Sequence, residues 1–189
     1  MCLREAGLVP VALLRENNQV IGAELLAPHP LSRLGFIPHE GAAACLSLSG
    51  DDILTENNAP QVLSVGLPFL VAERASRNAL ARVVPNRAGF DRVLPVDGAR
   101  SVYAYTRAAP DDSVDIYARA FSPRLCEDPA TGSATAATAA LLAEISKSAE
   151  RELRFRFVQG WKWGDPACWS PGFAKRRVAR SRSMSAAAV

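Results

Sequence analysis

Residues 127–134 read Glu-Asp-Pro-Ala-Thr-Gly-Ser-Ala, and this octapeptide is the most informative stretch of the chain. It follows a predicted strand over 114–121 and opens an alanine-rich helix, in which apolar side chains recur at helical spacing from Ala134 to Ile145. The first amide groups of a helix have no partner inside it, and the helix dipole adds positive potential there. The sequence therefore predicts an anion-binding site at the start of this helix.

Three positions of the octapeptide suit the chemistry of such a site. Gly132 lets a ligand approach the backbone closely, and the Ser133 hydroxyl can donate to a carboxylate. Asp128 can exchange a proton with a bound substrate or fix its amino group. A purely structural alternative stands beside this interpretation, because Asp-Pro is a common helix-start pair and Gly-Ser a common loop. The residues alone leave both interpretations open.

The segments around the octapeptide alternate between strand and helix patterns. Ser76 is a predicted helix cap, and Pro85 and Pro95 each end a helix. ELRFRFV at 152–158 has period two and predicts one strand. The pattern predicts a mixed α/β or α+β domain. Further strands are expected at 19–27, 61–73 (interrupted at Gly66 and Pro68) and 101–107, and short helices at 40–48, 78–84 and 87–93.

The composition is that of a globular protein. The 189 residues are 49% hydrophobic and 22% charged, which excludes collagen-like and strongly disordered chains. No stretch approaches the roughly 20 apolar residues of a membrane span. The four cysteines are scattered and the two histidines lie in proline-bounded turns, so we expect neither a disulfide framework nor a metal site. A reducing cytoplasm is the expected compartment.

The octapeptide EDPATGSA resembles the signature of the phenazine-biosynthesis PhzF-like family, relatives of diaminopimelate epimerase. Other segments resemble the same family in the same order: GLVPV with AELLAP, VLSVGLPFLVAE, VYAYTR, DIYARAFSP and ELRFRFVQG. The likeness runs over roughly residues 7–160. It implies one half of a diaminopimelate epimerase-like fold, a mixed sheet curled into a barrel around a central helix.

The resemblance also implies a function. Members of the family are cofactor-free isomerases or epimerases that move a proton on a small carboxylate, in a cleft between two similar halves. By motif match, Asp128 would assist proton transfer, and Thr131, Gly132 and Ser133 would bind the substrate. No metal or cofactor is implied.

Two departures from the family pattern shape the expected domain organisation. The family's first half, with its acid/base glutamate and a Cys-Gly-His-Ala-Thr-like motif, has no counterpart here. We therefore expect residues 1–17 to be a remnant of the linker, residues 18–160 to be the second domain, and the chain alone to be catalytically impaired. An uncovered cleft face predicts self-association or a homodimer.

The second departure is the ending, residues 161–189. It holds all three Trp and carries six Lys or Arg against one acid, so its net charge is +5, whereas the rest of the chain is −2. The family continues Gln-Gly-x-x-Met-Gly-Arg-Pro-Ser. Back-translation of Gly-Trp-Lys-Trp-Gly-Asp-Pro-Ala-Cys-Trp in a shifted frame permits Val-Glu-Met-Gly-Arg-Pro-Ser-Leu-Leu. Our hypothesis is a frame-shifted tail, which sequencing of the parent DNA would check.

Two other functions compete with the isomerase interpretation. One is a non-catalytic module that binds carboxylates or mediates oligomerisation. The other is nucleic-acid binding through the basic tail, where KRR and RSR suit phosphates. The negative charge of the remaining residues and the frame-shift hypothesis both argue against the latter.

Overall fold

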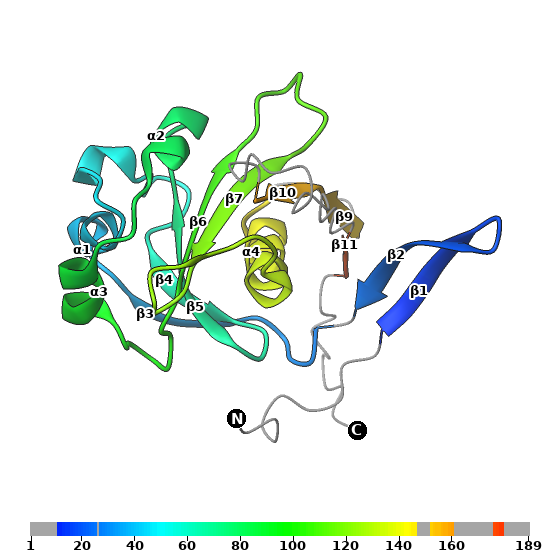
Figure 1. Ribbon diagram of the computed structural model, residues 1–189, viewed down its shortest axis with the longest axis horizontal. Helices are drawn as coiled ribbons and strands as arrows, with labels where there is room; N and C mark the ends of the chain where they lie inside the picture. Colours follow the sequence, from blue (N-terminus) through cyan, green and yellow to red (C-terminus); the bar gives the residue numbers. More distant parts are fainter. Residues whose placement is uncertain (1–10, 26, 147–151, 161–175, 180–189) are drawn as a thin grey trace, which may run out of the picture.

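A mixed sheet with helices on both faces forms the body of the protein (Figure 1). The computed structural model describes residues 11–25, 27–146, 152–160 and 176–179. The seven-stranded sheet runs in the order β10-β7-β6-β5-β4-β3, with β8 paired to β7. The pairs β5–β6 and β7–β10 are parallel and the others antiparallel. Its strands are β3 (Ser32–Phe36), β4 (Gln61–Ser64), β5 (Pro68–Glu73), β6 (Val102–Arg107), β7 (Ile116–Phe121), β8 (Glu127–Asp128) and β10 (Phe157–Gln159).

The long helix α4 (Gly132–Ile145) covers one face of the sheet. Its alanines allow neighbouring elements to approach the helix closely. Nine of its residues are buried, so α4 is packed around most of its circumference and not along a single apolar face. The core on this side joins α4 to inward side chains of β4 to β7 and β10, among them Tyr103 and Phe157.

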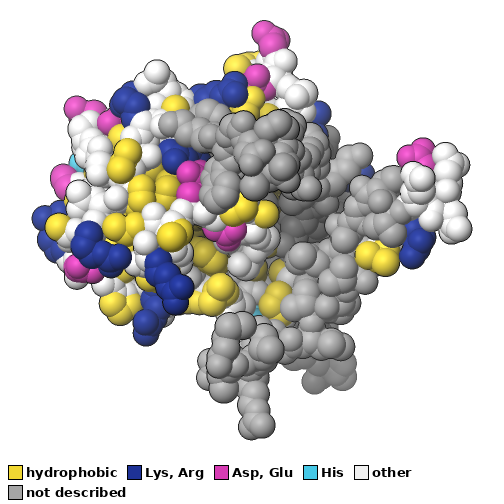
Figure 2. All heavy atoms as spheres, viewed as in Figure 1, with side chains coloured by type: hydrophobic (Ala, Val, Ile, Leu, Met, Phe, Trp, Pro, Cys, Tyr) yellow, Lys and Arg dark blue, Asp and Glu magenta, His cyan; other side chains and the backbone are white. Residues whose placement is uncertain are grey.

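Three short helices cover the opposite face: α1 (His39–Cys45), α2 (Arg77–Arg82) and α3 (Arg87–Val93). The Ser76 hydroxyl accepts a hydrogen bond from the amide of Ala79, as the predicted cap requires. Asn86 caps α3 in the same way by accepting from Gly89. A single 3-10 turn, η1 (Gly50–Asp52), follows α1. On the face seen in Figure 2, basic and acidic side chains lie interspersed over this helical layer.

A separate hairpin precedes the sheet, formed by β1 (Val11–Glu16) and β2 (Gln19–Leu25). Asn17 and Asn18 form its turn with φ of 47° and 64°, a conformation that asparagine tolerates. The expected linker boundary at residue 17 lies inside this hairpin.

The single strand expected over 152–158 is wrong: the segment is divided into β9 (Glu152–Phe155) and β10. Arg156 interrupts it, because its amide donates to Asp115 Oδ2 and its carbonyl accepts from the amides of Asp115 and Ile116. β9 then pairs with β11 (Arg176–Ala179), whereas β10 pairs with β7.

The predicted mixed α/β class is confirmed, but the barrel is not closed in the described residues, where β3 and β10 are open edges. Most of the tail, for which we hypothesised a frame shift, lies outside the described residues. That hypothesis stays a prediction.

Candidate functional site

The carboxylate of Asp128 is held at the end of β8 by two neutral donors. Its Oδ1 accepts from the Ala130 amide at 3.1 Å, and its Oδ2 accepts from the Thr131 hydroxyl at 2.8 Å. Asp128 is half-buried. Each carboxylate oxygen can accept two hydrogen bonds, so each keeps capacity for a ligand.

Gln159, at the end of β10, fixes the loop that follows Asp128. Its Oε1 accepts from the Thr131 amide at 3.2 Å, and its Nε2 donates to the Asp128 carbonyl at 2.7 Å and to Thr131 Oγ1 at 2.9 Å. Because Gln159 supplies a proton to Thr131 Oγ1, the hydroxyl hydrogen of Thr131 points to Asp128. Gly160 lies against the loop with φ +76°, and a Cβ there would be 3.1 Å from the Pro129 carbonyl oxygen.

Helix α4 begins at Gly132, four residues after Asp128. The first amide bonded back along the chain is that of Thr135, which donates to the Thr131 carbonyl. The amides of Gly132, Ser133 and Ala134 have no acceptor among the described residues. The helix is 14 residues long, and its dipole adds to their attraction for an anion.

The four predicted site residues therefore lie together, but they differ in position. Gly132 is exposed and Ser133 half-buried, next to the free amides. Thr131 is 9% exposed, and its side chain contacts Asp128 rather than capping α4. The assignment of these residues to substrate binding and catalysis stays a prediction.

Gln159 is the residue that the predicted site lacks. The sequence feature that could have indicated Gln159 is the Gln-Gly pair at the end of ELRFRFVQG. Only the family resemblance, and no pattern in the residues themselves, connects this pair with the octapeptide. Two elements 28 residues apart in sequence meet here, and no local periodicity reports that contact.

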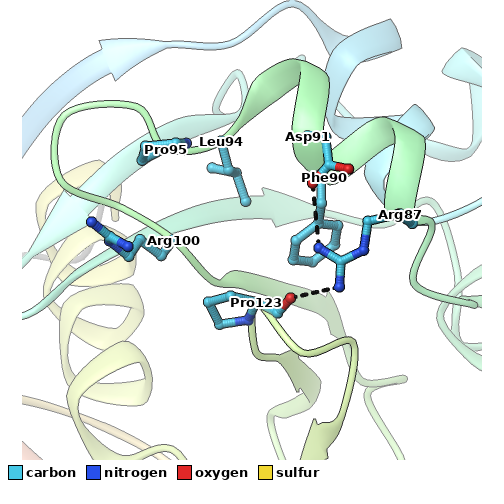
Figure 3. A pocket seen from close by; sticks show the side chains of 7 residues that line it. All are labelled: Arg87, Phe90, Asp91, Leu94, Pro95, Arg100 and Pro123. Atoms are coloured by element: carbon cyan, nitrogen blue, oxygen red, sulfur yellow. Dashed lines mark hydrogen bonds and ion pairs between the residues drawn. The ribbon is translucent and has the colours of Figure 1, made fainter.

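Two cavities among the described residues lie away from this loop. Figure 3 shows one of about 90 Å³ beside α3, where Arg87 donates to Asp91 and to the Pro123 carbonyl. The second, of about 310 Å³, lies at the other end of α4 and is lined by Asn57, Arg107, Leu142, Ile145, Ser146 and Phe155. None of residues 127–133 lines either cavity.

The two cysteines of the described residues lie outside the loop at 127–133. Cys45 is buried and Cys126 exposed, both as free thiols, and burial raises the pKa of Cys45 to about 11, which keeps it protonated at neutral pH. No helix in the described part of the chain is both long enough and apolar enough to cross a membrane.

Fold and site together define a mixed α/β protein in which a fixed acidic loop opens the central helix. The chain belongs to the PhzC-PhzF family, described as phenazine biosynthesis-like protein, whose model matches residues 3–168. No curated protein matches the chain.

Two solved structures are similar to the described fold. One is a phenazine biosynthesis protein of the PhzF family from Bacillus anthracis, with 20% identity and a TM-score of 0.69 over 83% of this chain. The other is a predicted epimerase from Pseudomonas aeruginosa, with 26% identity and a TM-score of 0.60 over 81% of this chain. The likeness covers 53% and 51% of those proteins, so the chain spans about half their length.

Proposed function

We propose that the loop at residues 127–133 binds the carboxylate of a small substrate and that Asp128 transfers a proton on that substrate, as in an isomerase or epimerase. One observation carries this proposal: a fixed carboxylate closely precedes the start of a 14-residue helix, where three amide groups have no acceptor among the described residues. Family membership and the likeness to a protein described as a predicted epimerase support it.

The chemistry follows from the donors present. The substrate carboxylate accepts from the free amides at Gly132 to Ala134 and from the Ser133 hydroxyl. Asp128 then faces the carbon next to that carboxylate: the carbon–hydrogen bond breaks, its electron pair stays on the substrate, and the proton forms an O–H bond on Asp128. Return of the proton to another position or to the other face completes the isomerisation. The Thr131 hydroxyl holds Asp128 Oδ2, and the Ala130 amide holds Oδ1.

The complete reaction needs more than this loop. Within residues 127–134, Asp128 is the one titratable group outside an ion pair, since Glu127 is paired with Arg119. We propose that the second acid/base group, and the strands that close the sheet around α4, belong to the half of the family fold that this chain does not span.

Proton exchange in D₂O tests the proposal. The protein is incubated with small amino and cyclic carboxylates, and deuterium incorporation is followed by NMR. Exchange that Asp128→Asn and Asp128→Ala abolish, and that Asp111→Asn on the exposed 108–113 turn retains, supports the proposal. Exchange that survives in both Asp128 variants contradicts it.

A non-catalytic carboxylate-binding module is the second candidate function. It is favoured because residues 127–134 hold one carboxylate outside an ion pair, Asp128, whereas the complete reaction needs a second acid/base group. In that case NMR titration shows carboxylate binding at the amides of 132–134 without deuterium incorporation.

We also propose self-association, because Leu34 and Phe36 on edge strand β3 are 40% and 65% exposed. A monomer at all concentrations in analytical ultracentrifugation would contradict that.

A further inference from the structure

Arg119 on β7 is a buried arginine whose donors are divided between two elements. Its Nε and Nη2 form a fork on Glu127, at 2.8 and 2.7 Å from Oε1 and Oε2. Its Nη1 donates to the carbonyls of Leu80 and Val83 at the end of α2, at 3.1 and 2.8 Å. The guanidinium also lies over the Phe121 ring, 4.9 Å from its centroid. Arg119 is 6% exposed, so this network is shielded from water.

The fork acts on the residue directly before Asp128. Strand β8 consists of Glu127 and Asp128 alone, paired with Phe121 and Ala120 of β7. Side chains alternate along a strand, so these two carboxylates leave β8 on opposite faces of the sheet. Glu127 enters the layer under α2, whereas Asp128 emerges on the face of α4.

A two-residue strand has little pairing of its own to keep it in place. Glu127 holds it from one face through the Arg119 fork, and Gln159 holds the following loop from the other face through the Asp128 carbonyl. Bidentate arginine–carboxylate pairs fix orientation as well as distance. The backbone of Asp128 is thus clamped between a buried ion pair and an amide side chain.

We infer that Arg119 and Glu127 are positioning residues for the site, setting where the Asp128 carboxylate lies without contacting substrate. The inference rests on the proposed function for its chemical meaning. Its structural content is independent of that function: loss of the fork releases residues 128–131 while α4 and its free amides stay in place.

The test uses two variants of the full chain. Glu127→Gln keeps the shape of the side chain and removes its charge. The double variant Arg119→Met with Glu127→Leu removes both charges together and leaves no buried ion unpaired, which protects the fold. Asp91→Asn is the matched control, because it breaks the exposed Arg87–Asp91 pair on α3.

The readouts are amide hydrogen exchange and proton transfer. We expect exchange at the amides of Ala130 and Thr131 to rise at least about tenfold in both variants, above any change in the core strands, and to be unchanged in Asp91→Asn. Where wild type incorporates deuterium into substrate, we expect the rate to fall on the order of 10²-fold with carboxylate affinity retained.

Wild-type exchange at these two amides in a folded double variant would overturn the inference. So would a uniform rise over the whole sheet, since that is the signature of general destabilisation. Failure of the proposed function gives another pattern: Asp128→Asn leaves substrate exchange or binding unaltered, while the amide exchange of the Glu127 variants still reports positioning. If the single variant does not fold, the double variant decides.

Discussion

Replacing Arg74 by methionine is expected to stabilise the fold. Arg74 follows β5 and is 0% exposed, and its Nε, Nη1 and Nη2 have no hydrogen-bond partner among the described residues. Its amide donates to the Tyr105 carbonyl, so the backbone is satisfied and the cost lies in the guanidinium. A buried charge without an acceptor destabilises a protein, and an apolar side chain of similar length removes that cost.

The magnitude follows from the pKa of Arg74. Burial lowers this pKa to about 10, and the nearby Asp52 and Tyr105 offset only part of the effect. Against an ordinary pKa above about 12, this corresponds to roughly 3 kcal/mol at neutral pH. Because methionine also adds some packing strain, we expect the free energy of unfolding to rise by about 1–3 kcal/mol.

The gain should depend on pH in a defined direction. Below pH 10 the guanidinium is charged in both the folded and the unfolded chain, so the full cost of burial is present. Above pH 10 the folded state releases the proton while the unfolded state keeps it, so the cost decreases as the pH rises. Burial raises the pKa of Tyr103, and because Arg74 is not among the groups that act on it, Tyr103 cancels in the difference between the two proteins. Burial also raises the pKa of Tyr105, and Arg74 opposes that rise, so Tyr105 stays neutral in the folded state whether or not Arg74 is present.

Urea denaturation at pH 7 and at pH 10.5 measures the effect, with Arg100→Met as the control. Arg100 is exposed, so its replacement should change stability by less than about 0.5 kcal/mol. A loss of 1 kcal/mol or more in Arg74→Met at pH 7 would refute the reasoning, because it would mean that the guanidinium has an acceptor in solution. An equal gain at both pH values would refute the role of charge.

Three further substitutions test the local structure, each by urea denaturation. Gly89→Ala should destabilise by about 2–4 kcal/mol, because its Cβ would overlap the carbonyl of Ala44 and separate α1 from α3; a neutral result would contradict that close approach. Ser76→Ala should lower the free energy of unfolding by about 1 kcal/mol through loss of the α2 cap, without changing how steeply that free energy falls with urea concentration. Gly160→Ala should cost about 1 kcal/mol or more from its φ of +76° and its contact with Pro129, and should increase amide exchange at residues 130–131.

Local signals in the sequence account for much of the fold. Ser76 caps α2 as predicted, and α3 ends at Val93, the expected end before Pro95. Helix α2 ends at Arg82, earlier than the expected end at residue 84. Caps and prolines act on neighbouring residues, so the sequence reports them well. The alternation in 152–158 wrongly predicted one strand, because this pattern too reports only on neighbouring residues. It reports which side chains share a face, but the break at Arg156 comes from Asp115, 41 residues away.

The proximity of the candidate site residues was predictable from the sequence, whereas their arrangement was not, and their role stays a prediction. Helix-start chemistry placed Asp128, Gly132 and Ser133 together, since they are close in sequence. The direction of the Thr131 hydroxyl depends on Gln159, which arrives from another strand. Arg119 was likewise visible only as one residue of an alternating strand, and its partner Glu127 becomes evident once β8 is paired with β7.

The register of β8 decides the roles of two adjacent carboxylates. Glu127 and Asp128 are chemically similar, yet the pairing with Phe121 and Ala120 sends the first to a buried arginine and the second to neutral donors beside α4. A slip of one residue would exchange the faces of the two side chains. The aspartate would then be too short to form the fork on Arg119, and the longer glutamate would enter the loop that Thr131 and Gln159 fit. The order Glu-Asp therefore matters physically, because only that order satisfies the buried guanidinium and still leaves a carboxylate at the start of the helix.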